Sequence, residues 1–414
     1  MRFRFFGIAL LAMSVAHAQA RPAESALVEK PAKCSAAVEA DGYVYLAGQN
    51  ANQADGSLPS TFDAQATQAL DNVKAIVETS GLTMEHVVYL QIYLEDVSDY
   101  TALSSVLRKY FPNIPPAGAV LGVSKLPRPA IQINAVAVRN LSGRKAVIPA
   151  NYKLDEPFSP GILTHDRLFV SAMQGRELGS GTLADDPAIQ TDLALDGLKA
   201  VVEAAGLSMK HYVFVNPYLT TKIPYRIMNE RYARRFDFGN TPGRATIEVT
   251  ALPQQAQIEY TGVAVRDLSL RRAIRPKNMP PSPTASPCVF AGATLYCSAK
   301  SGFIPGPHGG VFGNTTAAQL RQTMRNQLDN LEEADIDFDQ VVTTTAYLDD
   351  LSDAAAFNKV YSEYFSHGLP AQTLVQQLPS ADRTPDAEGH YPDLEQMSLI
   401  AVRNFKMTAA EACQ

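Results

Sequence analysis

A single arginine in a turn is the residue with the clearest chemical potential in this sequence. Arg244 stands in the run TPGRAT (241–246), directly before a strand-like segment. A planar guanidinium forms paired hydrogen bonds with a carboxylate, so this arginine suits the binding of a small acid. The runs PPAGAV (115–120) and LPAQTL (369–374) repeat the local pattern at a domain-sized spacing of about 127 residues. Gly118 and Gln372 replace the arginine there, so one copy of three carries the cation.

The elements around each turn follow one order, which indicates three copies of an α+β unit. Residues 62–80 have apolar side chains at helical spacing, with Asp63 placed to cap this helix and Gly81 placed to end it. In the first copy, the segments that predict strands are 42–48, 87–94, 120–126 and 131–138, and a second helix is expected at 100–111.

The second and third copies repeat this plan. All three close with related runs, AVRN (137–140), AVRD (264–267) and AVRN (401–404). A proline-rich linker, 275–283, precedes the third copy, and an insertion, 380–395, separates its last two strands. The corresponding segments are 168–172, 190–205, 212–218, 225–236, 246–249 and 258–265 in the second copy, and 295–299, 316–333, 341–348 and 354–365 in the third.

This plan divides the chain into a leader and three units. The expected strands carry apolar residues on both faces, so helices on one face leave the other face to be buried elsewhere. Three units could bury these faces against one another around a pseudo-threefold axis, which predicts a monomeric single-chain pseudo-trimer. The expected divisions are 1–20 for the leader and 21–146, 147–272 and 273–414 for the units.

The first 20 residues are typical of a signal peptide. A basic start, MRFR, precedes an apolar run of about 11 residues, which is too short to span a bilayer. Small residues then suit signal peptidase, so we expect cleavage near Ala18 or Ala20. The protein is accordingly expected to be periplasmic or secreted and to have no membrane helix.

The charge of the chain argues against nucleic-acid binding. Its formal net charge is −6, and no run rich in lysine or arginine appears. No phosphate loop, dinucleotide fingerprint or metal-ligand spacing stands out, so no cofactor and no metal are expected. Asp386, Glu388 and His390 lie close together in the insertion of the third unit and are interpreted as a polar loop.

Export would make the four cysteines candidates for disulfides. Cys288 and Cys297 flank a segment whose centre, Gly292-Ala293, suits a two-residue hairpin turn. That turn places the two cysteines opposite each other at a pair without mutual hydrogen bonds, where side chains approach most closely. A Cys288–Cys297 disulfide is therefore predicted, with two small buried thiols as the alternative. Cys34 and Cys413 lie near the two ends, and a bridge between them is a further possibility.

Residues 42–139 resemble the RidA/YjgF family of reactive intermediate deaminases. The resemblance is carried by GYVYLAGQ (42–49), QATQALDNV (65–73), VVYLQIYLED (87–96) and the closing AVR, and the ordered set recurs in the other two copies. It implies the family's chorismate-mutase-like α+β fold, with a ligand site in each cleft between units. It also implies hydrolysis of reactive enamines and imines, such as 2-aminoacrylate, to a keto acid and ammonia.

Position by position, the resemblance assigns roles to residues of the second unit. Arg244 matches the family's carboxylate-binding arginine, and Thr246 matches its hydroxyl or thiol two residues later. Asn229 matches the family's asparagine on the second helix; Asn358 and Ser104 take that place in the third and first units.

The acidic residue that the family carries before its closing run is missing in every unit. Asn134, Thr261 and Ser398 stand in its place, and Thr261 is expected to contact the substrate. Glu259 lies two residues before Thr261, on the same strand face, and is interpreted as the replacement proton donor or acceptor. An ordinary surface acid is the other interpretation of Glu259.

Together these residues predict an exported protein that hydrolyses a small carboxylate-bearing enamine or imine at an interdomain cleft. Arg244 would anchor the substrate, Asn229 and Thr246 would orient substrate or water, and Glu259 would transfer the proton. Two alternatives stay open. The chain could be a diverged biosynthetic enzyme for another small carboxylic substrate, or a protein that binds a small carboxylate without catalysis.

Overall fold

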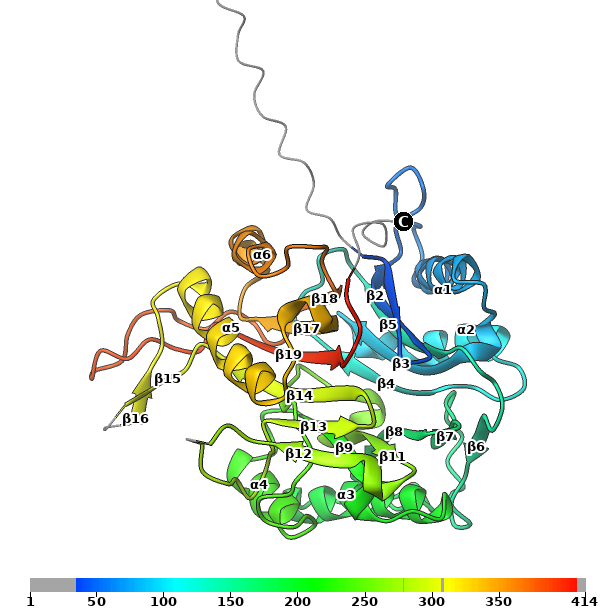
Figure 1. The fold of residues 1–414 in the computed structure, drawn as a ribbon. Coiled ribbons are helices and arrows are strands. Elements are labelled where there is room, and N and C mark those ends of the chain that lie inside the picture. Colours follow the sequence, from blue (N-terminus) through cyan, green and yellow to red (C-terminus); the bar gives the residue numbers. More distant parts are fainter. Residues whose placement is uncertain (1–34, 278, 307–308, 408–414) are drawn as a thin grey trace, which may run out of the picture. The chain divides into compact units, whose positions relative to one another are not determined.

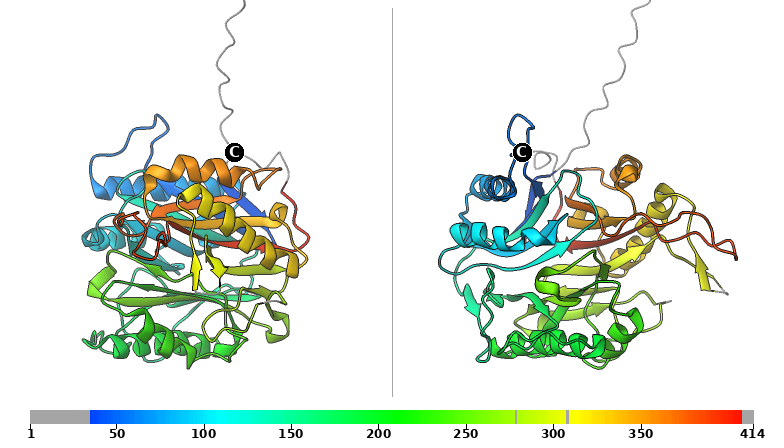
Figure 2. Two further views of the ribbon diagram at one scale, coloured as in Figure 1. Left: turned by 90° about the vertical axis from the view of Figure 1, so that its left-hand side faces the viewer. Right: turned by 180° about the vertical axis from the view of Figure 1, so that it is seen from behind.

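The computed structural model describes residues 35–277, 279–306 and 309–407. Three large β-sheets, one for each repeat, lie in one compact unit (Figure 1). The long helices lie at the periphery and the strands lie inward in the further views (Figure 2). The α+β class and the three-repeat organisation expected from the sequence are confirmed.

The first repeat has a five-stranded sheet in the order β1-β2-β5-β3-β4. Strands β3 and β4 pair in parallel, and the other neighbours pair antiparallel. Its elements are β1 (Ala37–Ala40), β2 (Tyr43–Asn50), α1 (Phe62–Thr79), β3 (Val87–Leu94), α2 (Tyr100–Tyr110), β4 (Ala117–Gly122) and β5 (Ile131–Val138).

The second repeat keeps this order and adds an edge strand, giving a sheet ordered β10-β9-β11-β8-β7-β6. Its elements are β6 (Lys145–Val147), β7 (Gly161–Leu163), β8 (Arg167–Gln174), α3 (Pro187–Ala204), β9 (Tyr212–Leu219), α4 (Tyr225–Ala233), β10 (Ile247–Glu248) and β11 (Ile258–Val265).

The third repeat has the sheet order β12-β13-β14-β19-β17-β18 and a separate hairpin, β15–β16. Its elements are β12 (Arg271–Ile274), β13 (Cys288–Ala291), β14 (Thr294–Ser301), β15 (Ile304–Gly306), β16 (Gly309–Val311), α5 (Thr316–Glu333), β17 (Val341–Leu348), α6 (Ala354–Ser362), β18 (Ala371–Gln376) and β19 (Glu395–Val402).

Helix α1 illustrates how local sequence makes these elements. Its buried side chains, from Ala66 to Val77, recur at three- and four-residue spacing and face the sheet. The hydroxyl oxygen of Thr61 accepts a hydrogen bond from the N–H of Ala64, so Thr61 caps the helix and the predicted cap Asp63 is wrong. Gly81 has a φ of 70°, a conformation that favours glycine, and it ends the helix as expected.

Both faces of each sheet are buried, as the sequence predicted. One face packs under the two helices of its own repeat. The other faces pack against neighbouring repeats, since one cluster of buried apolar side chains draws residues from all three. The threefold symmetry of this arrangement stays a prediction. The shared cluster includes Tyr93, Leu121, Tyr218, Val249, Tyr347 and Val375.

Some boundaries differ from the predicted ones. Strand β4 begins three residues before the expected 120–126 segment, because the chain already pairs with β3 at Ala117, opposite Tyr89. Strand β10 has two residues only, and the chain around Arg244 is irregular. Glu395 belongs to strand β19 instead of the insertion.

Two predictions concern residues outside the described ranges. The expected signal peptide and the possible Cys34–Cys413 bridge both fall there. Across the described ranges, no helix is long and apolar enough to cross a membrane.

Candidate functional site

Arg244 lies where the second repeat meets the third. Its backbone N–H donates to Ser298 Oγ at 2.8 Å, and its carbonyl accepts from the N–H of Ala299 at 3.1 Å. The turn is thereby held against strand β14, and the guanidinium is directed toward its own repeat. There, Arg244 Nη1 donates to Asn229 Oδ1 at 2.8 Å, and the guanidinium carbon lies 5.1 Å from the ring centre of Tyr232.

The side chain of Arg244 opens onto a cavity of about 350 Å³, which we call the Arg244 cleft. The structure places Arg244, Asn229 and Thr246 near one another: Thr246 lines the cleft, and Asn229 accepts a hydrogen bond from the guanidinium. Thr246 Oγ1 is buried without a hydrogen-bond partner among the described residues. The third repeat supplies the opposite wall through Ser298, Ala299, Lys300 and Gln396.

The charges of the Arg244 cleft are positive. Lys300 lines it together with Arg244, and its burial lowers the pKa of the ammonium group. No carboxylate belongs to the described residues that line the cleft. Burial raises the pKa of Tyr225 to about 12, to which the charges of Glu248 and Asp393 add, while Arg244 opposes them. A cleft with two cations suits a negatively charged ligand.

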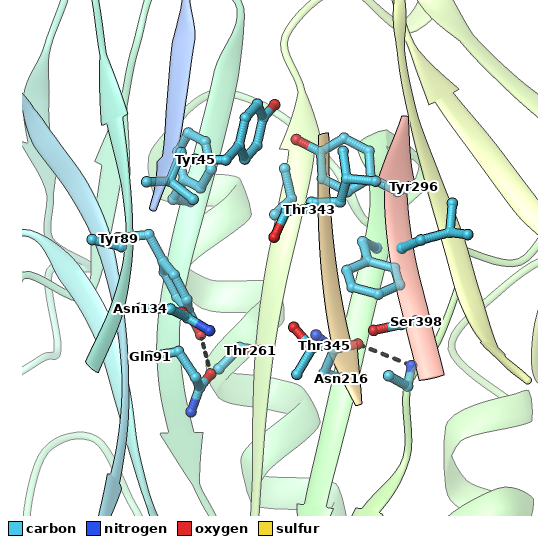
Figure 3. A pocket seen from close by; sticks show the side chains of 18 of the residues that line it. Tyr45, Tyr89, Gln91, Asn134, Asn216, Thr261, Tyr296, Thr343, Thr345 and Ser398 are labelled. Atoms are coloured by element: carbon cyan, nitrogen blue, oxygen red, sulfur yellow. Dashed lines mark hydrogen bonds between the residues drawn. The ribbon is translucent and has the colours of Figure 1, made fainter. Parts of the chain in front are cut away.

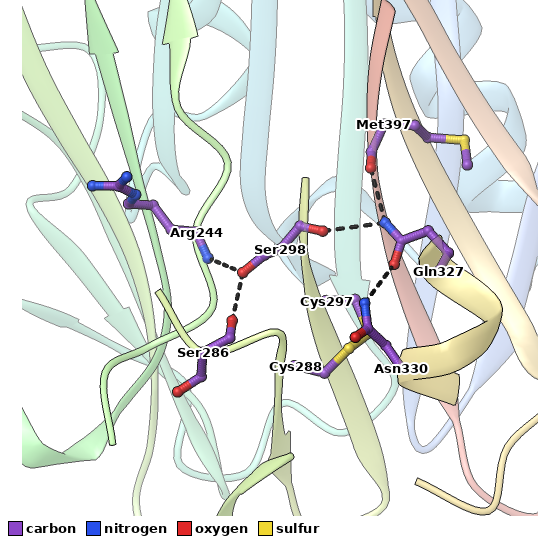
Figure 4. The surroundings of a disulfide bond; sticks show 8 residues. All are labelled: Arg244, Ser286, Cys288, Cys297, Ser298, Gln327, Asn330 and Met397. Carbon is purple, nitrogen blue, oxygen red and sulfur yellow. Dashed lines mark hydrogen bonds between the residues drawn. A yellow bond between two sulfur atoms is a disulfide. The ribbon is translucent and has the colours of Figure 1, made fainter. Parts of the chain in front are cut away.

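The predicted disulfide lies directly behind this wall. Cys288 and Cys297 are paired opposite each other across the β13–β14 hairpin and are bonded, with the Cα atoms 4.0 Å apart. Ser298 follows Cys297 on β14, accepts from the backbone N–H of Arg244 and donates its hydroxyl to the carbonyl of Ser286, which precedes β13 (Figure 4). The predicted disulfide between Cys288 and Cys297 across this hairpin is confirmed.

A bulge in β14 shapes the same wall. The register between β14 and β19 shifts between Cys297 and Lys300. The buried amide of Gln327, on helix α5, donates to the carbonyls of Ser298 and Met397, which the shift leaves available (Figure 4). The same shift occurs in β2 and β8, so it belongs to the repeat.

Glu259 lies in a different place from Arg244. It lines a small cavity between the first and second repeats, the Glu259 cleft, together with Gly118, Ser171, Met173 and other residues. Its side chain is fully buried, Oε1 has no partner among the described residues, and burial raises the pKa to about 8. The interpretation of Glu259 as a surface acid is wrong, and so is its placement beside Arg244.

Glu259 and Arg244 lie in different clefts because each cleft is formed by two repeats. Each cleft takes its turn from one repeat and its bulged strand and closing strand from the next. Glu259 therefore faces the turn of the first repeat, where Gly118 replaces the arginine and donates its N–H to Ser171 Oγ at 2.9 Å. The residue of β19 that matches Glu259 in register, opposite a tyrosine of the adjacent strand, is Gln396.

Thr261 lies in a third place, a cavity of about 120 Å³ enclosed by all three repeats (Figure 3). Its neighbours there include Asn134 and Ser398, which hold the equivalent positions of the other repeats. Tyr89 and Tyr218 donate to Gln91 Oε1 at 2.9 and 3.2 Å. The lining of this central cavity shares no residue with the Arg244 cleft, so Thr261 does not face a ligand bound at Arg244.

The structure thus divides the predicted site among three cavities and adds one residue. Lys300 is the group that the sequence interpretation missed. The strand was predicted to end at residue 299, but β14 (Thr294–Ser301) continues past it and includes Lys300. A charged residue directly after the apolar strand segment was the feature of the sequence that could have indicated it. In the acidic loop of the third repeat, Asp386 Oδ1 accepts from the N–H groups of Glu388 and His390, as in a turn. Ligand atoms of these three side chains lie within 4.8 Å of one another, and the interpretation as a polar loop stays a prediction.

These features define a three-repeat α+β protein with an arginine-bearing cleft between repeats. The family model described as Endoribonuclease L-PSP matches residues 25–139, 150–266 and 278–381, so the chain belongs to that family. The predicted resemblance to RidA proteins is confirmed by this threefold match.

Relatives of known name match one repeat at a time. A RutC family protein of Haemophilus influenzae is 36% identical over 110 residues, covering 25% of this chain and 84% of the relative. The 2-iminobutanoate/2-iminopropanoate deaminase of Escherichia coli is 36% identical over 92 residues, covering 21% of this chain and 72% of the relative.

One solved structure is similar across most of the chain. A chorismatase structure covers 77% of this chain and 93% of its own, with a TM-score of 0.51 and 13% identity. At that identity the similarity shows the fold alone.

Proposed function

We propose that this protein binds a small carboxylate-bearing imine or enamine in the Arg244 cleft and hydrolyses it to a keto acid and ammonia. The observation that carries this proposal is the guanidinium of Arg244, held by Asn229 at the edge of a cavity whose described lining contains no carboxylate. The similarity to a named imine deaminase supports the reaction class. The expected signal peptide supports a place of action outside the cytoplasm.

The reaction needs few groups. Water adds to the carbon of the C=N bond and gives one proton to the nitrogen, which forms a carbinolamine. The remaining O–H proton then moves to the nitrogen, and ammonia leaves as the C=O bond forms. Arg244 would hold the carboxylate through paired hydrogen bonds. Thr246, with its unpartnered hydroxyl, would position the water or the imine nitrogen. Glu259 has no part in this cleft.

A second candidate function is binding without turnover. It is favoured by Gln396, which stands in the Arg244 cleft where Glu259 stands in the Glu259 cleft. A glutamine cannot exchange a proton with a substrate. A cleft that keeps the anchor and lacks the acid suits the capture of a small carboxylate.

The test is the release of ammonia and keto acid from freshly generated 2-iminopropanoate and 2-iminobutanoate. We expect acceleration by the wild-type protein and a loss of about tenfold or more in Arg244→Met, since an anchoring charge-assisted pair is removed. Arg325→Gln changes an exposed arginine on α5 that pairs with Asp329 and should leave the rate unchanged.

Calorimetric titration with the corresponding keto acids separates the two candidates. Binding that depends on Arg244, without acceleration of the hydrolysis of either imine, would support the binding function and contradict the hydrolytic function. Absence of both binding and acceleration would overturn the assignment of the Arg244 cleft.

A further inference from the structure

The three contacts between repeats carry different charges at equivalent positions. The Arg244 cleft has Arg244 on its turn, Lys300 on its bulged strand and Gln396 on its closing strand. The Glu259 cleft has Gly118, Met173 and Glu259 in those places. Strand β18 of the third repeat packs against β2 of the first, where the positions are held by Gln372, Gln49 and Gln132.

The Arg244 cleft therefore has a lysine where the Glu259 cleft has a methionine, and a glutamine where the Glu259 cleft has its acid. Lys300 lies opposite Met397 in the β14–β19 ladder, as Met173 lies opposite Tyr260 and Gln49 lies opposite Ile133 in the other repeats. A methionine and a glutamine occupy the equivalent places, so the repeat fold itself does not require a charge there. The lysine is a feature of the Arg244 cleft.

Lys300 is a charge without a counter-charge. No hydrogen bond or ion pair to its ammonium group comes from the described residues. Glu248 and Asp393 act on Tyr225 at the margin, but neither lines the cleft. Arg244 likewise pairs with an amide oxygen and not with a carboxylate. Keeping two cations partly buried without a counter-charge costs free energy that an anionic ligand can recover.

We propose that the Arg244 cleft takes a molecule with two negatively charged groups, a dicarboxylate, with one carboxylate on Arg244 and the other on Lys300. This inference rests on the proposed function, in which Arg244 binds the first carboxylate. A monocarboxylate would satisfy one cation and leave the other partly desolvated. A dicarboxylate satisfies both and replaces water at both ends.

The two cations also differ in the contact they offer. Arg244 presents a planar fork, which holds a carboxylate in one orientation, while the ammonium of Lys300 is a point charge on a flexible stem. The guanidinium is fixed by Asn229, and the strand that carries Lys300 is fixed by Gln327 at the bulge. Arg244 would therefore position the reacting end of the ligand, and Lys300 would select for the second charge.

Matched pairs of ligands test this selection. 2-Oxoglutarate and 2-oxopentanoate share a five-carbon keto-acid chain and differ in the second carboxylate, and succinate and butanoate form a four-carbon pair. Calorimetric titration at neutral pH and low salt should show the wild-type protein binding the dicarboxylate of a pair about tenfold or more tightly than the monocarboxylate.

The variants separate the two cations. Lys300→Met should remove the preference and leave the affinity for the monocarboxylate within about twofold, whereas Lys300→Arg should retain the preference. Arg244→Met should weaken both ligands. Lys359→Met, which removes an exposed lysine on α6, should behave as the wild type. Thermal unfolding of each variant checks that it folds.

The possible outcomes test the dicarboxylate inference separately from the proposed function of Arg244, on which it rests. Equal wild-type affinity for the two members of every pair, or a preference that survives in Lys300→Met, overturns the dicarboxylate inference and leaves the function of Arg244 standing. No binding of any of the four ligands by the wild type also overturns the dicarboxylate inference, and the proposed function then stands or falls on the hydrolysis of 2-iminopropanoate and 2-iminobutanoate.

Discussion

Arg244, Gly118 and Gln372 occupy equivalent places in the three repeats, and their side chains decide what each contact between repeats can do. The arginine opens onto a cavity and keeps one side of its guanidinium on Asn229. At Gly118 no side chain would fit, because an added Cβ would lie 2.5 Å from the ring of Phe158. Gln372 has a buried amide nitrogen without a partner among the described residues. Charge recognition is thereby concentrated in one cleft.

Two buried carboxyls make stability depend on pH. Burial raises the pKa of Glu259 and Glu395 from 4.5 to about 8. Between those values the folded chain holds two protons that the unfolded chain has released. The free energy of unfolding is therefore expected to fall as the pH rises from about 5 to 8, by up to about 1.4 kcal/mol per pH unit for each carboxyl.

Urea denaturation across this pH range measures the effect. Glu259→Gln and Glu395→Gln should each reduce the slope of stability against pH, because the glutamine does not titrate. Glu203→Gln alters an exposed glutamate and should leave the slope unchanged. A wild-type stability that rises over the interval would contradict the prediction.

At the scale of elements, the β13–β14 hairpin joins stability to the site. Its disulfide links residues nine apart in sequence, and the strand beyond it supports Arg244 through Ser298. The helix α5 supports the same strand from behind through Gln327. A change in the hairpin should therefore alter the position of Arg244 in the cleft as well as the free energy of unfolding.

Loss of the disulfide is expected to lower the free energy of unfolding by about 2–3 kcal/mol, because the short loop of the unfolded chain is no longer closed. The measurement is urea denaturation of the wild type with and without reductant. Without reductant, Cys288→Ala/Cys297→Ala should lose the same stability, and any response to reductant that it keeps would come from Cys34 and Cys413. Equal stability with and without reductant would show that the bond contributes nothing.

At the scale of the whole molecule, one buried arginine joins all three repeats. Arg167 has no exposed side-chain surface, and its Nη2 donates to Asp41 of the first repeat and to Thr294 of the third, at 2.6 and 2.8 Å. Its Nη1 donates to Tyr296 at 3.1 Å, and its guanidinium lies over the ring of Tyr43. This contact is unique to the second repeat, since the equivalent strands begin with Tyr43 and Thr294.

Arg167→Met should lower the free energy of unfolding by about 3 kcal/mol, because it leaves the carboxylates of Asp41 and Asp166 without their cation. This decrease in the free energy of unfolding should lie at the lower end of the range for breaking buried ion pairs, since the side chain of Asp41 keeps partial access to water. Urea denaturation measures it, and Arg167→Met/Asp41→Asn should recover part of the loss. A single variant as stable as the wild type would show that the three-repeat contact is not stabilised by this pair.

Much of the fold followed from the sequence because it rests on local patterns. Helical spacing, glycine stops and β-rich runs predicted most helices and strands of the three repeats, and a two-residue turn predicted the register that joins Cys288 to Cys297. The short strands near the turns were predicted less well, since tertiary contacts and not periodicity define them. The turn itself pointed to Arg244.

The composition of the cleft was decided by tertiary structure alone. The sequence assigns Arg244 and Glu259 to one site because they belong to one repeat, but each cleft combines the turn of one repeat with the strands of the next. That pairing brings Lys300 and Gln396 to Arg244 and sends Glu259 to another cleft. The sequence of a single repeat determines which face a side chain takes on its strand. Which residue lies across the cleft depends on how the sheets of two repeats pack together, and a local sequence pattern does not predict this packing.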